Sequence, residues 1–313
     1  MSKIILIFGP TASGKSSFAI KLAKKIKGEI VNADSMQVYK QLSILTARPK
    51  KKDKKNIKHH LYGFQSVTKK FSTGAWLKLV KSIIKEIQKR NKVPILVGGT
   101  GLYFKSLTEG LVKIPNIPLR FRNKVRLLQK RIGQEKFYKK LITIDPLVEK
   151  QINSNDVQRT IRAFEIKKFT KKSITEWFKR TKILFDPSNF IKIYIDFPRE
   201  ELVKRIKKRV DQMFNEGVIL EVKKFNRLKV KKDNSSRKVI GIEEIGKLIN
   251  GEINLIEAKE RIFIKTRQYA KRQTTWARGQ MTSWQKINPN NLSLTLKKLR
   301  KITVQEKSLG LKK

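Results

Sequence analysis

Apolar and polar positions alternate with two different periods along the first hundred residues. Two short runs, Ile4–Phe8 and 93–97, are almost entirely apolar, which is typical of strands buried on both faces of a parallel sheet. Residues 28–32 (GEIVN) read as a further short strand. Residues 16–27 and 72–90 instead repeat their apolar positions every three to four residues, which predicts amphipathic helices. The alternation of strand and helix predicts an α/β fold with a doubly wound parallel sheet.

The pattern changes after Gly110. Residues 115–185 contain helical stretches rich in Arg, Lys and aromatic residues and show no strand-like period. We therefore predict an all-helical insertion domain there, of a usual domain size. The core domain would then consist of 1–114 and 186–313, in which residues 190–197 return to the sheet as a strand and helices fill most of the rest.

The segment between the first strand and the first helix reads GPTASGKS, a phosphate-binding loop. Glycines let such a loop curl so that its N–H groups face a phosphate, and the helix N-terminus adds partial positive charge. Lys15 supplies a full charge, and Ser16 is placed to donate its hydroxyl oxygen to Mg²⁺. We expect diphosphate to be held by Gly9, Pro10, Thr11, Ala12, Ser13, Gly14, Lys15 and Ser16.

Composition narrows the function classes. The 313 residues include 74 Lys and Arg against 25 Asp and Glu, for a net charge of +49, which favours a nucleic-acid partner; a general lysine bias of the genome would give the same excess. The chain has no cysteine, which excludes disulfides and thiolate metal sites. His59 and His60 are adjacent and poorly disposed to share a metal. Because no apolar run approaches 18 residues, we expect a soluble, cytoplasmic protein.

Two aspartates are candidates for a functional carboxylate near the phosphate loop. Nucleotide kinases of the phosphate-loop class carry a strand-end aspartate that holds magnesium, and Asp196 ends the strand at 190–197. Asp34 follows the strand next to the loop, where a carboxylate can accept a proton from a nucleophile. A turn or helix-capping aspartate is the alternative role of Asp34. Arg205 and Arg209, one helical turn apart, are either phosphate clamps or a solvated face.

Several blocks together closely resemble the bacterial tRNA dimethylallyltransferases. The match is collinear from about Lys3 to Trp284. The blocks are residues 9–16 (GPTASGKS), 32–35 (NADS), 38–39 (VY), 46–49 (TARP), 60–61 (HL), 97–103 (VGGTGLY), 156–159 (DVQR) and 266–273 (TRQYAKRQ), with Trp276. The fold that this resemblance implies is a nucleotide-kinase-like phosphate-loop core with a helical insertion.

The resemblance also implies a reaction. Dimethylallyl diphosphate gives its five-carbon group to the exocyclic N6 amine of the adenosine on the 3′ side of the tRNA anticodon, and diphosphate leaves. Lys15, the loop amides and Mg²⁺ would stabilise the leaving group. Asp34 would accept the amine proton, and Thr100 would hydrogen-bond near the reaction centre. The family implies a monomer.

Contacts with tRNA are implied for three further segments. One follows the second strand, one lies in the insertion and one near the carboxyl end, where an aromatic ring among basic residues can stack a base. The residues are Asp34, Ser35, Met36, Gln37, Thr100, Arg122, Gln158, Arg159, Thr160, Ile161, Arg162, Lys271, Arg272, Gln273, Trp276 and Arg278. Whether Arg237 or Lys238 approaches the diphosphate stays open.

Three other functions fit parts of the sequence. An enzyme that prenylates free adenine nucleotides would share the core but would not need the basic insertion. A small-molecule kinase would use Asp196 to hold magnesium. A non-catalytic RNA-binding protein would keep the loop without using it.

Overall fold

The computed structural model describes residues 3–54 and 56–287. The chain divides into two units, residues 1–108 with 185–313 and residues 109–184, and each is described by itself. Within the described ranges, no helix is long and apolar enough to span a membrane.

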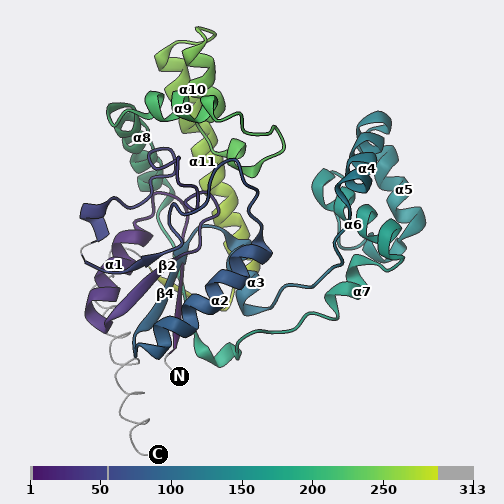
Figure 1. Ribbon diagram of the computed structural model, residues 1–313, viewed down its shortest axis with the longest axis horizontal. Coiled ribbons are helices and arrows are strands. Elements are labelled where there is room, and N and C mark those ends of the chain that lie inside the picture. Colours follow the sequence, from purple (N-terminus) through teal and green to yellow (C-terminus); the bar gives the residue numbers. More distant parts are fainter. Residues whose placement is uncertain (1–2, 55, 288–313) are drawn as a thin grey trace, which may run out of the picture. The chain divides into compact units, whose positions relative to one another are not determined.

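A six-stranded sheet of parallel strands forms the centre of the first unit (Figure 1). The strand order is β3-β2-β4-β1-β5-β6. The central strands confirm the predicted doubly wound sheet, since each is a largely buried apolar run. The strands are β1 (Ile4–Phe8), β2 (Gly28–Asn32), β3 (His59–His60), β4 (Val93–Gly98), β5 (Phe190–Ile195) and β6 (Gln285–Ile287).

Neither edge strand was predicted from the sequence. The lysine-rich segment 48–60 has no strand-like pattern, but it ends in the two-residue β3, where Ile30 pairs with His59 and Val31 with His60. The three-residue β6 pairs with β5 at the opposite edge. Strands this short have no detectable period, so only tertiary pairing defines them.

Helices cover both faces of the sheet. The helix α1 (Lys15–Ile26) packs Phe18, Leu22 and Ala23 on one face. The helices α2 (Thr73–Lys89) and α3 (Gly101–Thr108) lie on the other face. There the Trp76 ring stacks on Tyr103 with 4.2 Å between ring centroids.

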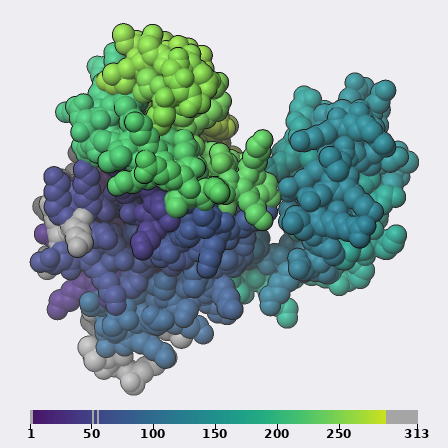
Figure 2. Space-filling model, turned by 45° about the horizontal axis from the view of Figure 1, so that its top comes forward, coloured from purple at the N-terminus to yellow at the C-terminus, as the bar shows by residue number. Residues whose placement is uncertain are grey.

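Four further helices of this unit build a second apolar core with the segment after β2. They are α8 (Arg199–Asn215), α9 (Val218–Arg227), α10 (Ile242–Ile249) and α11 (Leu255–Gln280). Their buried residues, such as Ile206 and Ile262, pack with Val38, Tyr39 and Leu45. Figure 2 shows the green residues of this helical layer directly against the purple and blue N-terminal residues. Segments far apart in sequence therefore meet at the carboxyl ends of the strands.

The second unit is helical, as predicted for the insertion. It consists of α4 (Leu119–Ile132), α5 (Gln134–Ile144), α6 (Val157–Thr170) and the short α7 (Ile174–Phe178). Its own core contains Val125, Phe137, Leu141 and Phe164. Single 3₁₀ turns occur in the two units at Lys51–Lys54, Pro146–Val148, Pro187–Asn189 and Ser235–Lys238.

A buried carboxylate ties the β3 edge of the sheet to its neighbours. Glu29 on β2 is 1% exposed and its oxygens contact His60 Nε2 at 2.7 Å, Arg90 Nη2 at 2.8 Å and Lys92 Nζ at 3.2 Å. Burial raises the pKa of Glu29, but hydrogen bonds from Arg90, His60 and Lys92 outweigh it and lower the pKa to about 2. His60 thus has a structural partner, and His59 Nδ1 lies 2.8 Å from the Ile57 carbonyl oxygen.

Glu29 should make the stability of the core unit depend on acid. Its pKa falls from 4.5 to about 2 on folding, so its contribution is complete above pH 4.5 and is lost as pH falls toward 2. We expect Glu29→Ala to lower the free energy of unfolding at pH 7 by about 2 kcal/mol, less than for a fully buried pair because the cations reach solvent. Urea unfolding at pH 7 and pH 3 measures both effects. An equal loss at the two pH values would contradict the prediction.

Candidate active site

The loop between β1 and α1 has the curled backbone that a phosphate cradle requires. Gly14 is the N-cap of α1 with φ of 80°, and Ala12 has φ of 64°. Ser13 is buried and lies against Gly9, where an added Cβ would come within 2.7 Å of its hydroxyl oxygen. The Ser13 side chain therefore packs beneath the loop. Gly9 N, Thr11 N and Ser13 N are bound within the protein, so the amides at the start of α1 are the ones placed to bind an anion.

Two cations and one amide hold this loop. Lys15 Nζ donates to the Pro10 carbonyl at 3.1 Å. Arg209 Nη1, from α8, donates to Thr11 Oγ1 at 2.8 Å, and Gln273 Oε1, from α11, accepts from Thr11 N at 2.8 Å. Burial lowers the pKa of Lys15 to about 8, although Asp34 opposes this, and burial also lowers the pKa of Arg209. Two buried positive charges, Lys15 and Arg209, thus lie close to the loop with little solvent around them.

Asp34 lies in a tight turn after β2. Its Oδ1 accepts from Met36 N at 2.9 Å and Gln37 N at 3.3 Å, so the turn role that we left open is real. Among the described residues nothing donates a hydrogen bond to Oδ2, which leaves that oxygen for chemistry. After the larger effect of burial, the negative charge of Asp34 helps to raise the pKa of Tyr269.

Thr100 fixes the turn that carries Asp34. Its Oγ1 accepts from Ser35 N at 2.9 Å and lies 3.2 Å from Ser35 Oγ. The approach is close because Gly98 has no side chain: a Cβ there would overlap the Ala33 carbonyl. The predicted residues Asp34, Ser35 and Thr100 are therefore brought together by β2 and β4.

A cavity of about 390 Å³ opens between the loop, the Asp34 turn and helices α8 and α11. One part of its wall is polar and carries Lys15, Ser16, Asp34, Arg209 and Arg272. The apolar part consists of Met36, Leu45, Ile206, Val210, Met213, Val239, Ile240 and Ile262. The cavity thus suits a ligand with an anionic end and a short apolar end.

Buried carboxylates support the wall around Leu45. Glu221 on α9 accepts from Ser43 N, Ile44 N and Leu45 N at 2.6, 2.8 and 2.9 Å. Leu45 also lies against Gly241, where any Cβ would overlap it.

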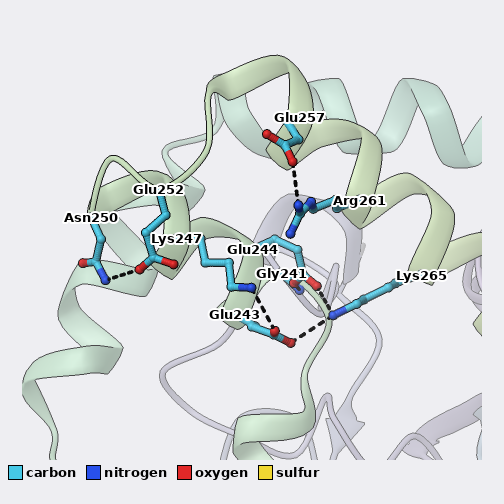
Figure 3. Close-up of polar contacts among 9 residues, drawn as sticks. All are labelled: Gly241, Glu243, Glu244, Lys247, Asn250, Glu252, Glu257, Arg261 and Lys265. Carbon is cyan, nitrogen blue, oxygen red and sulfur yellow. Dashed lines mark hydrogen bonds and ion pairs between the residues drawn. The ribbon is translucent and has the colours of Figure 1, made fainter.

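A polar network around α10 fixes Gly241 in turn. Glu244 accepts from Gly241 N at 2.9 Å. Figure 3 shows Lys265 of α11 paired with Glu243 and Glu244. The apolar wall is therefore held from two sides, by α9 and by the contact of α10 with α11.

One predicted tRNA contact near the carboxyl end is buried and another is partly buried. Gln273 is 5% exposed, and its Nε2 donates to the Gly99 carbonyl at 2.9 Å while Oε1 accepts from Thr11 N. Both ends of its amide thus bind the protein, and its contact with tRNA stays a prediction. The Trp276 ring packs on Gly101 and lies 6.0 Å from the Phe8 ring. Lys271, Arg272 and Arg278 are exposed.

In the second unit, the predicted contacts separate by burial. Gln158 and Arg159 are exposed, and Arg122 and Arg162 are partly exposed. Thr160 is fully buried and donates to the Asp156 carbonyl at 2.7 Å, and Ile161 packs against the core of this unit. Thr160 therefore holds the start of α6 through its side chain, and its contact with tRNA stays a prediction.

Part of the cavity was not predicted from the sequence. Arg209 was noted but not assigned, and its helical spacing from Arg205 was the available signal; Arg205 lies over the Phe197 ring at 4.2 Å. Lys238, not Arg237, lines the cavity, because Arg237 Nε donates to the Val230 carbonyl. Tyr269 lies in one of the blocks that carry the resemblance but was given no role, and no local pattern marked the apolar wall.

The site offers few oxygen ligands for a metal. No group of three or more His, Asp or Glu residues suited to a metal occurs in residues 3–54 and 56–287. Mg²⁺ that is shared with phosphate oxygens and water needs only one or two protein oxygens, and Ser16 and Asp34 both face the cavity. Asp196 is exposed and does not line the cavity; Tyr194 donates to it at 3.3 Å.

Sequence comparisons give consistent relatives. The sequence model of the family described as IPP transferase matches residues 37–280. A tRNA dimethylallyltransferase of Pelagibacter ubique (strain HTCC1062) is 61% identical over 304 residues, 97% of this chain and 97% of that protein. A tRNA dimethylallyltransferase of Rickettsia massiliae (strain Mtu5) is 44% identical over 299 residues, 94% of this chain and 82% of that protein.

Solved structures give the same kind of match. The full-length tRNA isopentenylpyrophosphate transferase of Bacillus halodurans aligns with a TM-score of 0.70 and 31% identity, over 98% of each chain. A eukaryotic dimethylallyltransferase, described as acting on tRNA, aligns with a TM-score of 0.79 and 28% identity, over 92% of this chain and 74% of that chain.

Binding of inorganic diphosphate should weaken above pH 8. The pKa of Lys15 is lowered to about 8, so the Lys15 ammonium in the unliganded protein loses its charge as pH rises through that value. We expect Lys15→Arg to bind with no such inflection, because a guanidinium stays protonated. Calorimetric titrations of both proteins from pH 6.5 to 9.5 measure the difference, and the ionisation of diphosphate itself cancels between them. Parallel profiles would show that Lys15 does not titrate there.

Proposed function

This chain belongs to the IPP transferase family, and from that premise we propose that it transfers the dimethylallyl group of dimethylallyl diphosphate to N6 of the adenosine on the 3′ side of the tRNA anticodon. It is an enzyme, a tRNA dimethylallyltransferase. The observation that carries the proposal is the cavity, whose wall combines the cationic phosphate loop, an apolar part and the carboxylate of Asp34.

The reaction exchanges one bond for another. The bond between the allylic carbon and the bridging diphosphate oxygen breaks, its electron pair leaves with the diphosphate, and the N6 lone pair forms the new carbon–nitrogen bond. Lys15, Arg209 and the loop amides offset the charge that develops on the leaving group, in a site that excludes much of the water. The dimethylallyl chain lies along the apolar wall formed by residues such as Leu45 and Met213.

Asp34 accepts the proton that N6 releases. Oδ1 is held by the turn, so Oδ2 is the oxygen that receives it, and Thr100 holds the turn through Ser35. Thr100 is a positioning residue in this arrangement, since its hydroxyl is engaged with Ser35.

Mg²⁺ would be held by the Ser16 hydroxyl together with oxygens of the bound diphosphate. When bound, the ion supplies positive charge that stabilises the leaving diphosphate. Ser16 begins the first turn of α1, where its hydroxyl faces the cavity beside Lys15.

The tRNA substrate supplies the adenine from a loop, where leaving the base stack costs only a few kcal/mol. Exposed basic residues such as Arg159, Lys271 and Arg272 bind its backbone. The kinase alternative lacks support, since Asp196 lies outside the cavity. Prenylation of free nucleotides would leave the basic insertion without a role.

The substrate is tested with labelled dimethylallyl diphosphate. The purified protein is incubated with unmodified tRNA, with AMP, and with ATP alone. We expect label on tRNA and none on AMP. Label on AMP alone, or hydrolysis of ATP without transfer, would refute the proposal.

Asp34→Asn separates the two roles of Asp34. Asparagine keeps an oxygen that accepts from Met36 and Gln37, so the turn is preserved, but it cannot take the proton. We expect kcat to fall by about 10²-fold or more, with tRNA affinity within about twofold of the wild type. Single-turnover rates and tRNA binding give the two values, and diphosphate affinity shows whether the charged site survives. An unchanged kcat would leave Asp34 a turn residue only.

A further inference from the structure

The helical unit holds one buried carboxylate among three arginines. Glu165 on α6 is 1% exposed. Its Oε2 lies 3.3 Å from Arg122 Nε and 3.3 Å from Arg162 Nη1, and its Oε1 lies 3.9 Å from Arg126 Nε. We call these four residues the Glu165 cluster. It joins α4, which carries Arg122 and Arg126, to α6.

The charges of the cluster do not balance. Three guanidinium groups against one carboxylate leave two positive charges, and no other carboxylate of the described residues pairs with these arginines. Their side chains are 37%, 41% and 39% exposed, so each arginine is anchored at one end and open to solvent at the other. Five N–H donors on each guanidinium far exceed what one carboxylate can accept.

Hydrogen bonding inside the cluster is also incomplete. Arg122 Nε and Glu165 Oε1 are both buried and have no hydrogen-bond partner. Burying a carboxylate is costly, and an apolar residue at that position would often be as stable. Stability alone therefore does not explain the negative charge of Glu165. The arrangement of three arginines around it does.

The surroundings point to a polyanion. The fourteen residues of α4 include six Lys or Arg and no acidic residue, and Glu165 is the single acid within α6. Arg122 and Arg126 are one turn apart on the same face of α4, where like charges repel. The contacts of Glu165 hold Arg122 and Arg126 close to Arg162 in one patch. The paired N–H donors of these guanidinium groups suit phosphate oxygens.

We infer that Glu165 is a positioning residue that arranges Arg122, Arg126 and Arg162 into one binding patch for phosphates of the tRNA backbone. Arg126 is thereby a further tRNA contact, beyond those that the family resemblance implies. The inference rests on the proposed function for the identity of the RNA.

Glu165→Gln tests the inference by the sign of its effect. Removing a negative charge from a basic surface should, by net charge alone, strengthen tRNA binding. If Glu165 positions the arginines, binding should instead weaken by about tenfold, the scale of one charge-assisted hydrogen bond. The matched control is Glu135→Gln on α5, an exposed glutamate whose one ion pair among the described residues is with Lys139; this variant should bind tRNA as well as the wild type or better.

The arginine itself is tested by Arg126→Ala against Lys124→Ala. Both changes remove one positive charge from α4, but Lys124 lies two residues away from Arg122 and Arg126, on another face of the helix. Arg126→Ala should reduce the salt slope of tRNA binding by about 0.9, as for one lost phosphate contact, and Lys124→Ala should change it less. Lys124 is exposed and the Arg126 side chain is 41% exposed, so both variants should fold.

Kinetics separate positioning from simple damage. Glu165→Gln and Arg126→Ala should raise KM for tRNA while kcat and KM for dimethylallyl diphosphate stay unchanged, and the thermal unfolding of Arg126→Ala should match the wild type. Wild-type protein that neither binds nor prenylates tRNA would refute the proposed function. Wild-type activity together with Glu165→Gln binding as tight as wild type, or tighter, would overturn the inference alone.

Discussion

The burial of Lys15 and Arg209 beside a single carboxylate is the constraint on which the rest of the core depends. Both cations have a lowered pKa because the site takes them out of water, and Asp34 offsets only part of that cost. Because burying these charges costs free energy, the loop that carries Lys15 must be held in place by other contacts. Arg209 on α8 and Gln273 on α11 hold the loop through Thr11, although both helices are far from β1 in sequence.

The glycines after β4 show how closely the surrounding chain must approach. Gly98, Gly99 and Gly101 face the Ala33 carbonyl, the Gln273 amide and the Trp276 ring, and any Cβ would overlap these groups. The motif was recognised in the sequence by resemblance, whereas its physical cause appears only in the packing. A short glycine-rich segment thus permits the contact between α11, the phosphate loop and the Asp34 turn.

Local signals account for what the sequence predicted correctly. The inner strands are buried apolar runs, and the phosphate loop is a contiguous octapeptide, so neither needs information from elsewhere in the chain. Contacts such as Arg209 with Thr11 and Gln273 with Thr11 join residues 198 and 262 positions apart. No local period encodes them, so the hold of Gln273 on the phosphate loop could not be predicted from the sequence. The apolar wall comes from several separate segments and was invisible for the same reason.

The hold of Gln273 on Thr11 has a consequence for synthesis. Thr11 in the phosphate loop is translated 262 residues before its partner Gln273. The central strand β1 also lacks its neighbour β5 until Phe190, which pairs with Ile4, has been made. Because such long-range pairing comes late and slowly, the nascent loop stays without these contacts until α11 has been synthesised, and its affinity for ligands develops only then.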